Sequence, residues 1–146
     1  MTEEILNANV AHVDDVPVLR GAPADWLEAE RFAGRTRQAL GKHLHLTQFG
    51  VNYTTLEPGA WSSLRHWHTA EDEFVLVLAG ELTLVDANGA RLLGAGAFCA
   101  FPAGVANAHH LMNAGTEPVT FLEVGSRRRG EDTVHYPFDP IGPIRR

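Results

Sequence analysis

Short segments typical of β-strands, separated by glycine and proline residues, fill most of the sequence after residue 42. Their aliphatic and aromatic residues alternate with polar ones, as in strands that bury one face. They recur at a spacing of roughly ten residues, which is typical of β-sandwiches and barrels. Asn88-Gly89, a dipeptide favoured in tight hairpin turns, separates two of them. The pattern predicts an all-β fold, with strands over residues 43–46, 47–56, 65–68, 73–78, 82–85, 92–93, 97–101, 109–112 and 119–124.

The two ends of the chain are less regular. Residues 1–40 form a predicted N-terminal arm, in which Pro23 and Gly34 bracket a short helix over residues 24–32. An extended arm that packs across a sheet is the alternative. Residues 41–130 are the predicted barrel, and the proline-rich residues 131–146 form a C-terminal arm that packs on the barrel or exchanges with another one.

His66, His68 and Glu73 form the most informative group of polar residues. Two histidines two positions apart project from the same face of an extended strand. Glu73 begins an apolar run, where a carboxylate is costly to bury unless a cation meets it. Two imidazoles and a carboxylate on adjacent strands are suitable ligands for a first-row transition metal.

The spacing of these residues resembles the two motifs of the cupin superfamily. The first motif is represented by Gly59, His66-x-His68, four residues, Glu73, six residues and Gly80. The second is represented by Gly96, five residues, Pro102-Ala103-Gly104, and then His109, three residues and Asn113. The resemblance covers residues 45–126 and is greatest to small single-domain bacterial cupins, some of which are labelled sugar-phosphate isomerases.

The resemblance implies a double-stranded β-helix, the jelly-roll barrel, with one divalent transition metal per chain. The implied ligands are His66, His68, Glu73 and His109, and the ion could be Fe, Mn, Ni, Cu or Zn. Asn107 stands where the second motif usually has its histidine. Either the loop after Gly104 is two residues longer and brings His109 to the metal, or the fourth ligand is lost. The retained spacing from His109 to Asn113 favours the longer loop.

Four protein ligands leave two positions open on an octahedral ion, which suits a small substrate that chelates through two oxygens. We therefore expect an enzyme of the isomerase, lyase or dioxygenase type. The alternatives are a non-catalytic module that binds a metal or a small ligand, and a barrel with a vestigial site. Proton transfer would need a further titratable group, for which Glu73, His45 and Tyr53 are weak candidates; Gln48 and Asn52 could bind a ligand, and His43 or His45 could line the mouth of the barrel. No arginine cluster lies within the motif region, which counts against a phosphorylated sugar.

Charge and composition exclude other classes of partner. The net charge of −6, from 12 basic and 18 acidic residues, argues against nucleic-acid binding. No apolar run approaches the roughly 18 residues of a membrane span. Cys99 is the only cysteine, which excludes an intrachain disulfide and favours the cytoplasm. We expect a homodimer, because sheet edges need cover, and an outward or interface position for His110.

Overall fold

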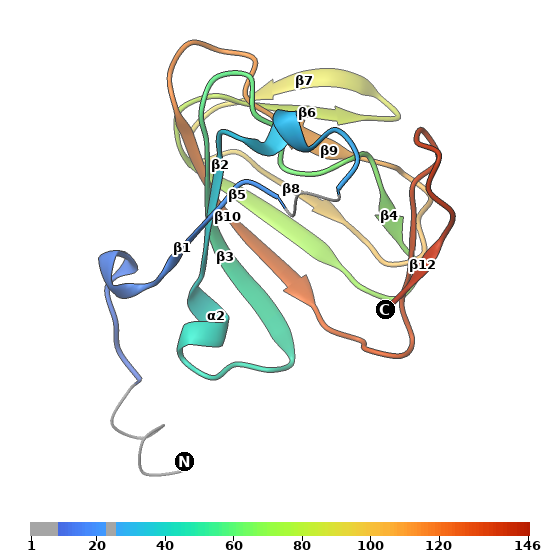
Figure 1. Ribbon diagram of the computed structural model, residues 1–146, viewed down its shortest axis with the longest axis horizontal. Coiled ribbons are helices and arrows are strands. Elements are labelled where there is room, and N and C mark those ends of the chain that lie inside the picture. The colour runs from blue at the N-terminus through green and yellow to red at the C-terminus, as the bar shows by residue number, and fades with distance from the viewer. Residues whose placement is uncertain (1–8, 23–25) are drawn as a thin grey trace.

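Twelve strands build the part of the chain that the computed structural model describes, residues 9–22 and 26–146 (Figure 1). The all-β prediction is confirmed. The strands are β1 (Val18–Arg20), β2 (Arg35–Ala39), β3 (Phe49–Leu56), β4 (Trp67–His68), β5 (Glu73–Ala79), β6 (Leu82–Asp86), β7 (Gly89–Leu93), β8 (Phe98–Phe101), β9 (His110–Met112), β10 (Val119–Ser126), β11 (Thr133–His135) and β12 (Ile144–Arg145). One short α-helix, α2 (Leu40–His43), and two 3-10 turns, η1 (Val13–Asp15) and η2 (Ala29–Phe32), accompany them.

The strands form one large and two small antiparallel sheets. The large sheet has the order β1-β2-β3-β10-β5-β8, and the small sheets have the orders β7-β6-β9 and β12-β11-β4. Strands far apart in the sequence are neighbours, so that β10 pairs with both β3 and β5. In Figure 1 the small sheets lie on one side of the large one, which is the arrangement of a jelly roll.

The core lies between the sheets and follows the strand alternation. Phe121 pairs with Thr54 on one side and with Val77 on the other, and all three are buried. The β7-β6-β9 sheet contributes Leu82, Leu84 and Leu111 to the same apolar cluster. The inner face of the large sheet therefore carries every second residue of β3, β10 and β5, which determines the side chains that can reach the interior.

Two predictions about local structure are wrong. Residues 43–46 are not a strand, because α2 and the turn after it reverse the chain between the paired strands β2 and β3, and His45 takes a positive φ of 69°. A four-residue alternation is too short to distinguish a strand from a turn. The helix predicted over residues 24–32 is the single turn η2, although residues 24 and 25 lie outside the described part.

Two strands of the predicted N-terminal arm, β1 and β2, are part of the large sheet and extend it beyond β3. The alternative of an extended arm is thus closer than the helical arm, but these strands pair at the edge of the sheet and do not pack across it. Asn88-Gly89 does lie at a hairpin between β6 and β7, where Gly89 has a positive φ of 95°. Among the described residues, no helix is long and apolar enough to cross a membrane.

Candidate metal centre

Three segments meet at one end of the barrel. Glu73 is the first residue of β5, and His68 is the last residue of β4. His66 and His109 form an antiparallel β-bridge, in which each backbone N–H donates to the carbonyl of the other residue, with N···O distances of 3.1 and 3.0 Å. The fold thus brings the second-motif histidine beside the first-motif pair.

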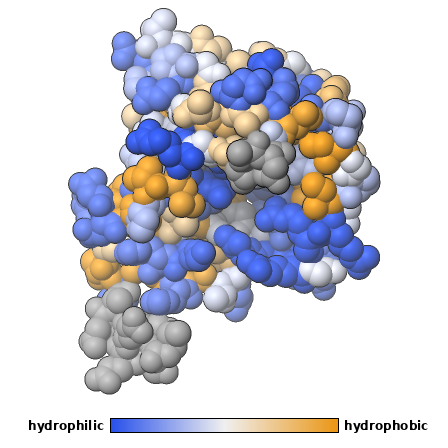
Figure 2. Space-filling view, in the orientation of Figure 1, coloured by the Kyte–Doolittle hydropathy of each residue, from blue (hydrophilic) through white to orange (hydrophobic). Residues whose placement is uncertain are grey.

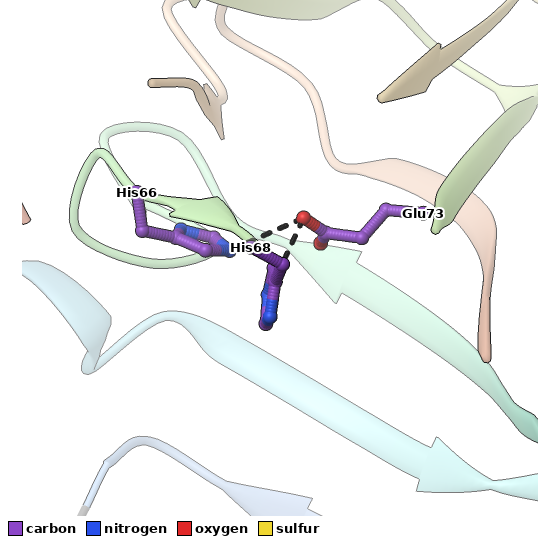
Figure 3. Close-up of side chains that lie close together, drawn as sticks. All are labelled: His66, His68 and Glu73. Atoms are coloured by element: carbon purple, nitrogen blue, oxygen red, sulfur yellow. Dashed lines mark ion pairs between the residues drawn. The ribbon is translucent and has the colours of Figure 1, made fainter. Parts of the chain in front are cut away.

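The three predicted histidines converge on one carboxylate oxygen of the fourth predicted residue, Glu73. Oε1 of Glu73 lies 3.0 Å from Nε2 of His109, 3.4 Å from Nε2 of His68 and 3.5 Å from Nε2 of His66. Figure 3 shows the side chains of His66 and His68 beside the Glu73 carboxylate, with which both form ion pairs. The donor atoms of His66, His68 and Glu73 all lie within 4.8 Å of one another and could hold a metal ion.

Asn107 turns away from this group. Its side-chain oxygen accepts a hydrogen bond from the backbone N–H of Ala87 at 3.0 Å, and its amide nitrogen donates to Asp86 at 3.2 Å. Its side chain therefore holds the β6–β7 hairpin, and His109 is the second-motif residue that faces Glu73. This placement corresponds to the longer loop.

Each histidine is oriented through its other ring nitrogen. Nδ1 of His66 donates to the carbonyl of Leu64 at 2.8 Å, and Nδ1 of His109 donates to the carbonyl of Asn107 at 2.9 Å. Nδ1 of His68 lies 2.7 Å from a carboxylate oxygen of Asp132. Because a carbonyl can only accept, the proton of a neutral ring stays on Nδ1 and leaves the Nε2 lone pair free. The donor set therefore fits a transition metal.

Asp132 is the residue of this centre that sequence reasoning missed. It is completely buried, and its second oxygen accepts the backbone N–H of Ala70 at 2.9 Å. Burial by itself raises the pKa of the Asp132 carboxyl, but the bond with His68 and the backbone donors outweigh it and hold the pKa below its usual range. Asp132 lies in the predicted C-terminal arm, 64 residues from His68, and no local pattern links the two.

Glu73 and the histidines around it stabilise the charged forms of one another. Burial raises the pKa of Glu73, but hydrogen bonds from His109 and His66 outweigh this and hold it far below its usual range. For His66, burial lowers the pKa, and the contact with Glu73 more than offsets it, so that the pKa is raised. Glu73 is therefore an ionised carboxylate at neutral pH, as binding of a cation requires.

Aromatic side chains enclose the cluster. The ring of Phe101 stacks on His109 with 3.5 Å between the ring centroids and an angle of 5° between the planes. The ring centroid of Tyr136 lies 6.0 Å from that of His66. Burial is the main cause of a raised pKa for Tyr136. A hollow of about 430 Å³ is lined mainly by outer-face residues of the large sheet, such as Phe49, Phe74 and Val124, together with Glu73 and Phe101.

A second polar group lines the inner face of the large sheet. Glu123 pairs with Asn52 on β3 and with the buried Val75 on β5, which places it on the inner face. The hydroxyl of Thr54 donates to the Glu123 carboxylate at 2.5 Å. The sequence held a signal for Glu123, because Val119, Phe121 and Glu123 alternate within one predicted strand.

The other candidate ligand-binding residues are spread out. Asn52 is on the inner face beside Glu123, but Tyr53 pairs with Leu122 on the outer face. Gln48, His43 and His45 are exposed. His110 lies on the face of β9 opposite the core residue Leu111, as predicted, but it is not exposed to solvent. It is 5% exposed, packs edge-on against Trp61 at 4.5 Å between ring centroids, and donates through Nδ1 to the carbonyl of Ser63.

Residues 52–125 match the Cupin_2 family, a cupin domain. A protein from Silicibacter pomeroyi, described as a sugar phosphate isomerase from a cupin superfamily, is 38% identical with a TM-score of 0.82; the match covers 91% of this chain and 88% of that one. A candidate sugar phosphate isomerase from Acidithiobacillus ferrooxidans is 37% identical with a TM-score of 0.67, over 70% of this chain and 65% of that one. A polyketide cyclase from Streptomyces resistomycificus shares the fold at 21% identity and a TM-score of 0.67, over 89% and 85% of the two chains. No curated protein sequence matches the chain.

Proposed function

The chain belongs to the cupin superfamily, and from this premise we propose that it is a metal-dependent isomerase of a small substrate that chelates through two oxygens. The observation that carries the proposal is the convergence of three imidazole Nε2 atoms on the Glu73 carboxylate, with each Nδ1 held by an acceptor. His66, His68, Glu73 and His109 would hold one divalent transition metal. When bound, such a metal polarises carbonyl and hydroxyl oxygens as a Lewis acid.

The protein's own contribution is enclosure and proton transfer. Val75 and Phe101 are buried walls beside the cluster and would exclude water, which strengthens electrostatic interactions within the site. On β10, Gly125 pairs with Glu73, and Glu123 is the next residue along the same face. Glu123 is therefore the inner-face carboxylate closest to Glu73 in the strand register. We assign to Glu123 the role of accepting a proton from a carbon next to the substrate carbonyl.

Two findings favour isomerisation over dioxygen chemistry. The solved structures that are 38% and 37% identical to this chain are described as sugar phosphate isomerases. An isomerase also needs a titratable group beside its substrate, whereas dioxygen chemistry needs less from the protein. Glu123 meets that requirement better than His45 or Tyr53, which lie outside the barrel interior.

The test is exchange of solvent deuterium into hydroxy-carbonyl compounds, followed by NMR, together with metal analysis of protein purified without chelator. Wild-type protein should contain one transition metal per chain and catalyse exchange. Glu123→Gln should keep the metal and lose about 100-fold or more in exchange rate, and His68→Ala should lose both. The exposed Glu81→Gln is the matched control. Metal-loaded protein that catalyses no exchange would instead support a non-catalytic binding module.

We also propose that the protein is a homodimer that buries the outer face of the large sheet. One row of this face crosses all six strands, from Val18 through Gln38, Tyr53, Leu122 and Leu76 to Phe98. Its two ends are exposed, Val18 at 51% and Phe98 at 68%. Apolar residues also gather over β1 on the left of Figure 2, where this strand forms a free edge of the sheet. A second copy would cover both the row and the edge.

A further inference from the structure

Two arginine side chains on β2 belong to the inner face of the large sheet. Arg37 pairs with Thr54, and Arg35 pairs with Leu56, and both partners are completely buried inner-face residues. Arg35 is itself only 8% exposed, and Arg37 is half-buried. Since directly paired residues of an antiparallel sheet share a face, both arginines are inner-face residues.

The two guanidinium groups lack the partners that buried charges require. Within residues 9–22 and 26–146, no carboxylate oxygen lies within 4.0 Å of either group. Arg35 donates through Nη1 to the carbonyl of Gly21 at 3.1 Å. The Nε atoms of Arg35 and Arg37 are both buried and have no hydrogen-bond partner in the described part of the chain. A buried charged donor without an acceptor is costly, so this arrangement calls for an anion.

Glu123 is the acidic group that influences the pKa of Arg35, but it does not neutralise the pair. Its carboxylate already accepts the hydroxyl of Thr54, the residue that lies between β2 and β10 at the level of Arg37. Burial is the main cause of a lowered pKa for Arg35, proximity to Arg37 lowers it further, and Glu123 offsets these effects only in part. The pair therefore retains positive charge in a poorly solvated position.

We propose that Arg35 and Arg37 bind a doubly charged oxyanion group of the substrate, with a phosphate monoester as the favoured class. The inference rests on the proposed function, because it assigns a binding site to the end of the substrate that does not reach the metal centre. In register, Glu123 lies between the arginines on β2 and Glu73 on β5. A substrate held in this way would place its anionic group at Arg37, its reacting carbons at Glu123 and its oxygens at the histidine cluster. Guanidinium groups suit this task because their donors match phosphate oxygens in pairs.

This assignment reverses an expectation from the sequence. The motif region contains no arginine cluster, which counted against a phosphorylated substrate. The cluster comes instead from β2, which precedes both motifs and lies beside the motif strands through its pairing with β3.

The test measures binding of inorganic phosphate by calorimetry, with the full chain both metal-loaded and chelator-treated. Wild-type protein should bind phosphate in both forms, and Arg37→Gln should weaken binding at least tenfold while leaving metal content unchanged. Arg37 is the better position to change because Arg35 donates a hydrogen bond to the carbonyl of Gly21, whereas Arg37 forms no side-chain hydrogen bond within the described residues. Arg37→Lys should retain part of the affinity, and the exposed Arg129→Gln is the matched control. Acetate should bind far more weakly than phosphate; equal affinity would assign the site to carboxylates.

Two outcomes would overturn the inference. One is phosphate binding that disappears on chelation and is unchanged in Arg37→Gln, because the anion would then be bound by the metal alone. The other is the absence of phosphate binding in wild-type protein. A further comparison uses Glu123→Gln, which removes a negative charge that acts on Arg35. This variant should bind phosphate several-fold more tightly if the arginines face a ligand. If the arginines serve only as counter-charges for Glu123, it should destabilise the fold without tighter binding. If protein purified without chelator contains no metal and catalyses no exchange, yet binds phosphate through Arg37, the proposed enzyme is refuted and the anion site is kept.

Discussion

Asp132, in the C-terminal segment, holds Nδ1 of His68 at 2.7 Å and thereby connects the end of the chain to the candidate metal centre. The contact is completely buried on the Asp132 side, and β11, which follows Asp132, pairs with β4 through Val134 and His68. The C-terminal segment therefore orients a predicted ligand in addition to covering the barrel. Carboxylate–histidine pairs of this kind fix the ring and make its other nitrogen a better ligand.

We expect Asp132→Asn to lower metal affinity about 10- to 100-fold without preventing folding, because the neutral amide supports the His68 ring less well. Competition with a fluorescent chelator would measure the affinity, and circular dichroism would confirm that the strands remain. The neighbouring Glu131→Gln, whose side chain is exposed and pairs only with Arg128, is the control. Equal affinities of the two variants would mean that Asp132 serves stability alone.

A second prediction separates His109 from Asn107 as the fourth ligand. His109→Ala should reduce the metal content of protein purified without chelator, because one of four donors is lost. Asn107→Ala should keep the metal but lose about 1–2 kcal/mol of unfolding free energy, since two hydrogen bonds to the β6–β7 hairpin disappear. Metal analysis and urea unfolding of both variants distinguish these effects. Loss of metal only in Asn107→Ala would reverse the assignment.

A third prediction concerns acid stability. Burial raises the pKa of Asp86, but the backbone N–H of Asn88, the Asn107 amide and Arg91 outweigh it and hold the pKa below its usual value. Because the folded pKa lies below the unfolded value of about 3.9, this carboxylate stabilises the fold above about pH 4 and ceases to do so as pH falls through the folded pKa. Asp86→Asn should therefore lose about 1–3 kcal/mol at pH 7.

The loss in Asp86→Asn should shrink as the pH is lowered below 4, where wild-type protein loses the same contribution. Urea unfolding at pH 7 and pH 3 measures both limits, with the exposed Asp14→Asn as the control. A loss that is the same at both pH values would show that Asp86 acts through packing and not through its charge.

The sequence predicted the fold well because strands that bury one face alternate in composition. Segments such as residues 73–78 and 119–124 combine alternation with length, and both are strands of the large sheet. The 43–46 segment alternates as well, yet it forms α2 and a turn, because the connection between paired antiparallel strands must reverse the chain. Alternation reports which face is buried only when the segment is long enough to be a strand.

The sequence indicates the predicted metal ligands, but not the residue that orients His68 or the arginines of the proposed anion site. His66, His68 and Glu73 are close in sequence, and the motif spacing pointed to His109. Asp132, Arg35 and Arg37 lie outside the motifs, and they reach the barrel interior only through pairings that join β11 to β4 and β2 to β3. Such long-range register is a property of tertiary structure that local patterns do not encode.

The last prediction tests the homodimer. Phe98→Glu places a charge at one exposed end of the outer-face row that runs from Val18 to Phe98, where a second copy would have to bury it. We expect light scattering to give twice the chain mass for wild-type protein at micromolar concentration and a mass shifted toward the monomer for the variant. Leu92→Glu is the matched control, because Leu92 is 64% exposed but lies on β7 in a different sheet. A monomeric wild-type protein would contradict the homodimer, whereas dissociation by Leu92→Glu and not by Phe98→Glu would move the interface to the small sheet.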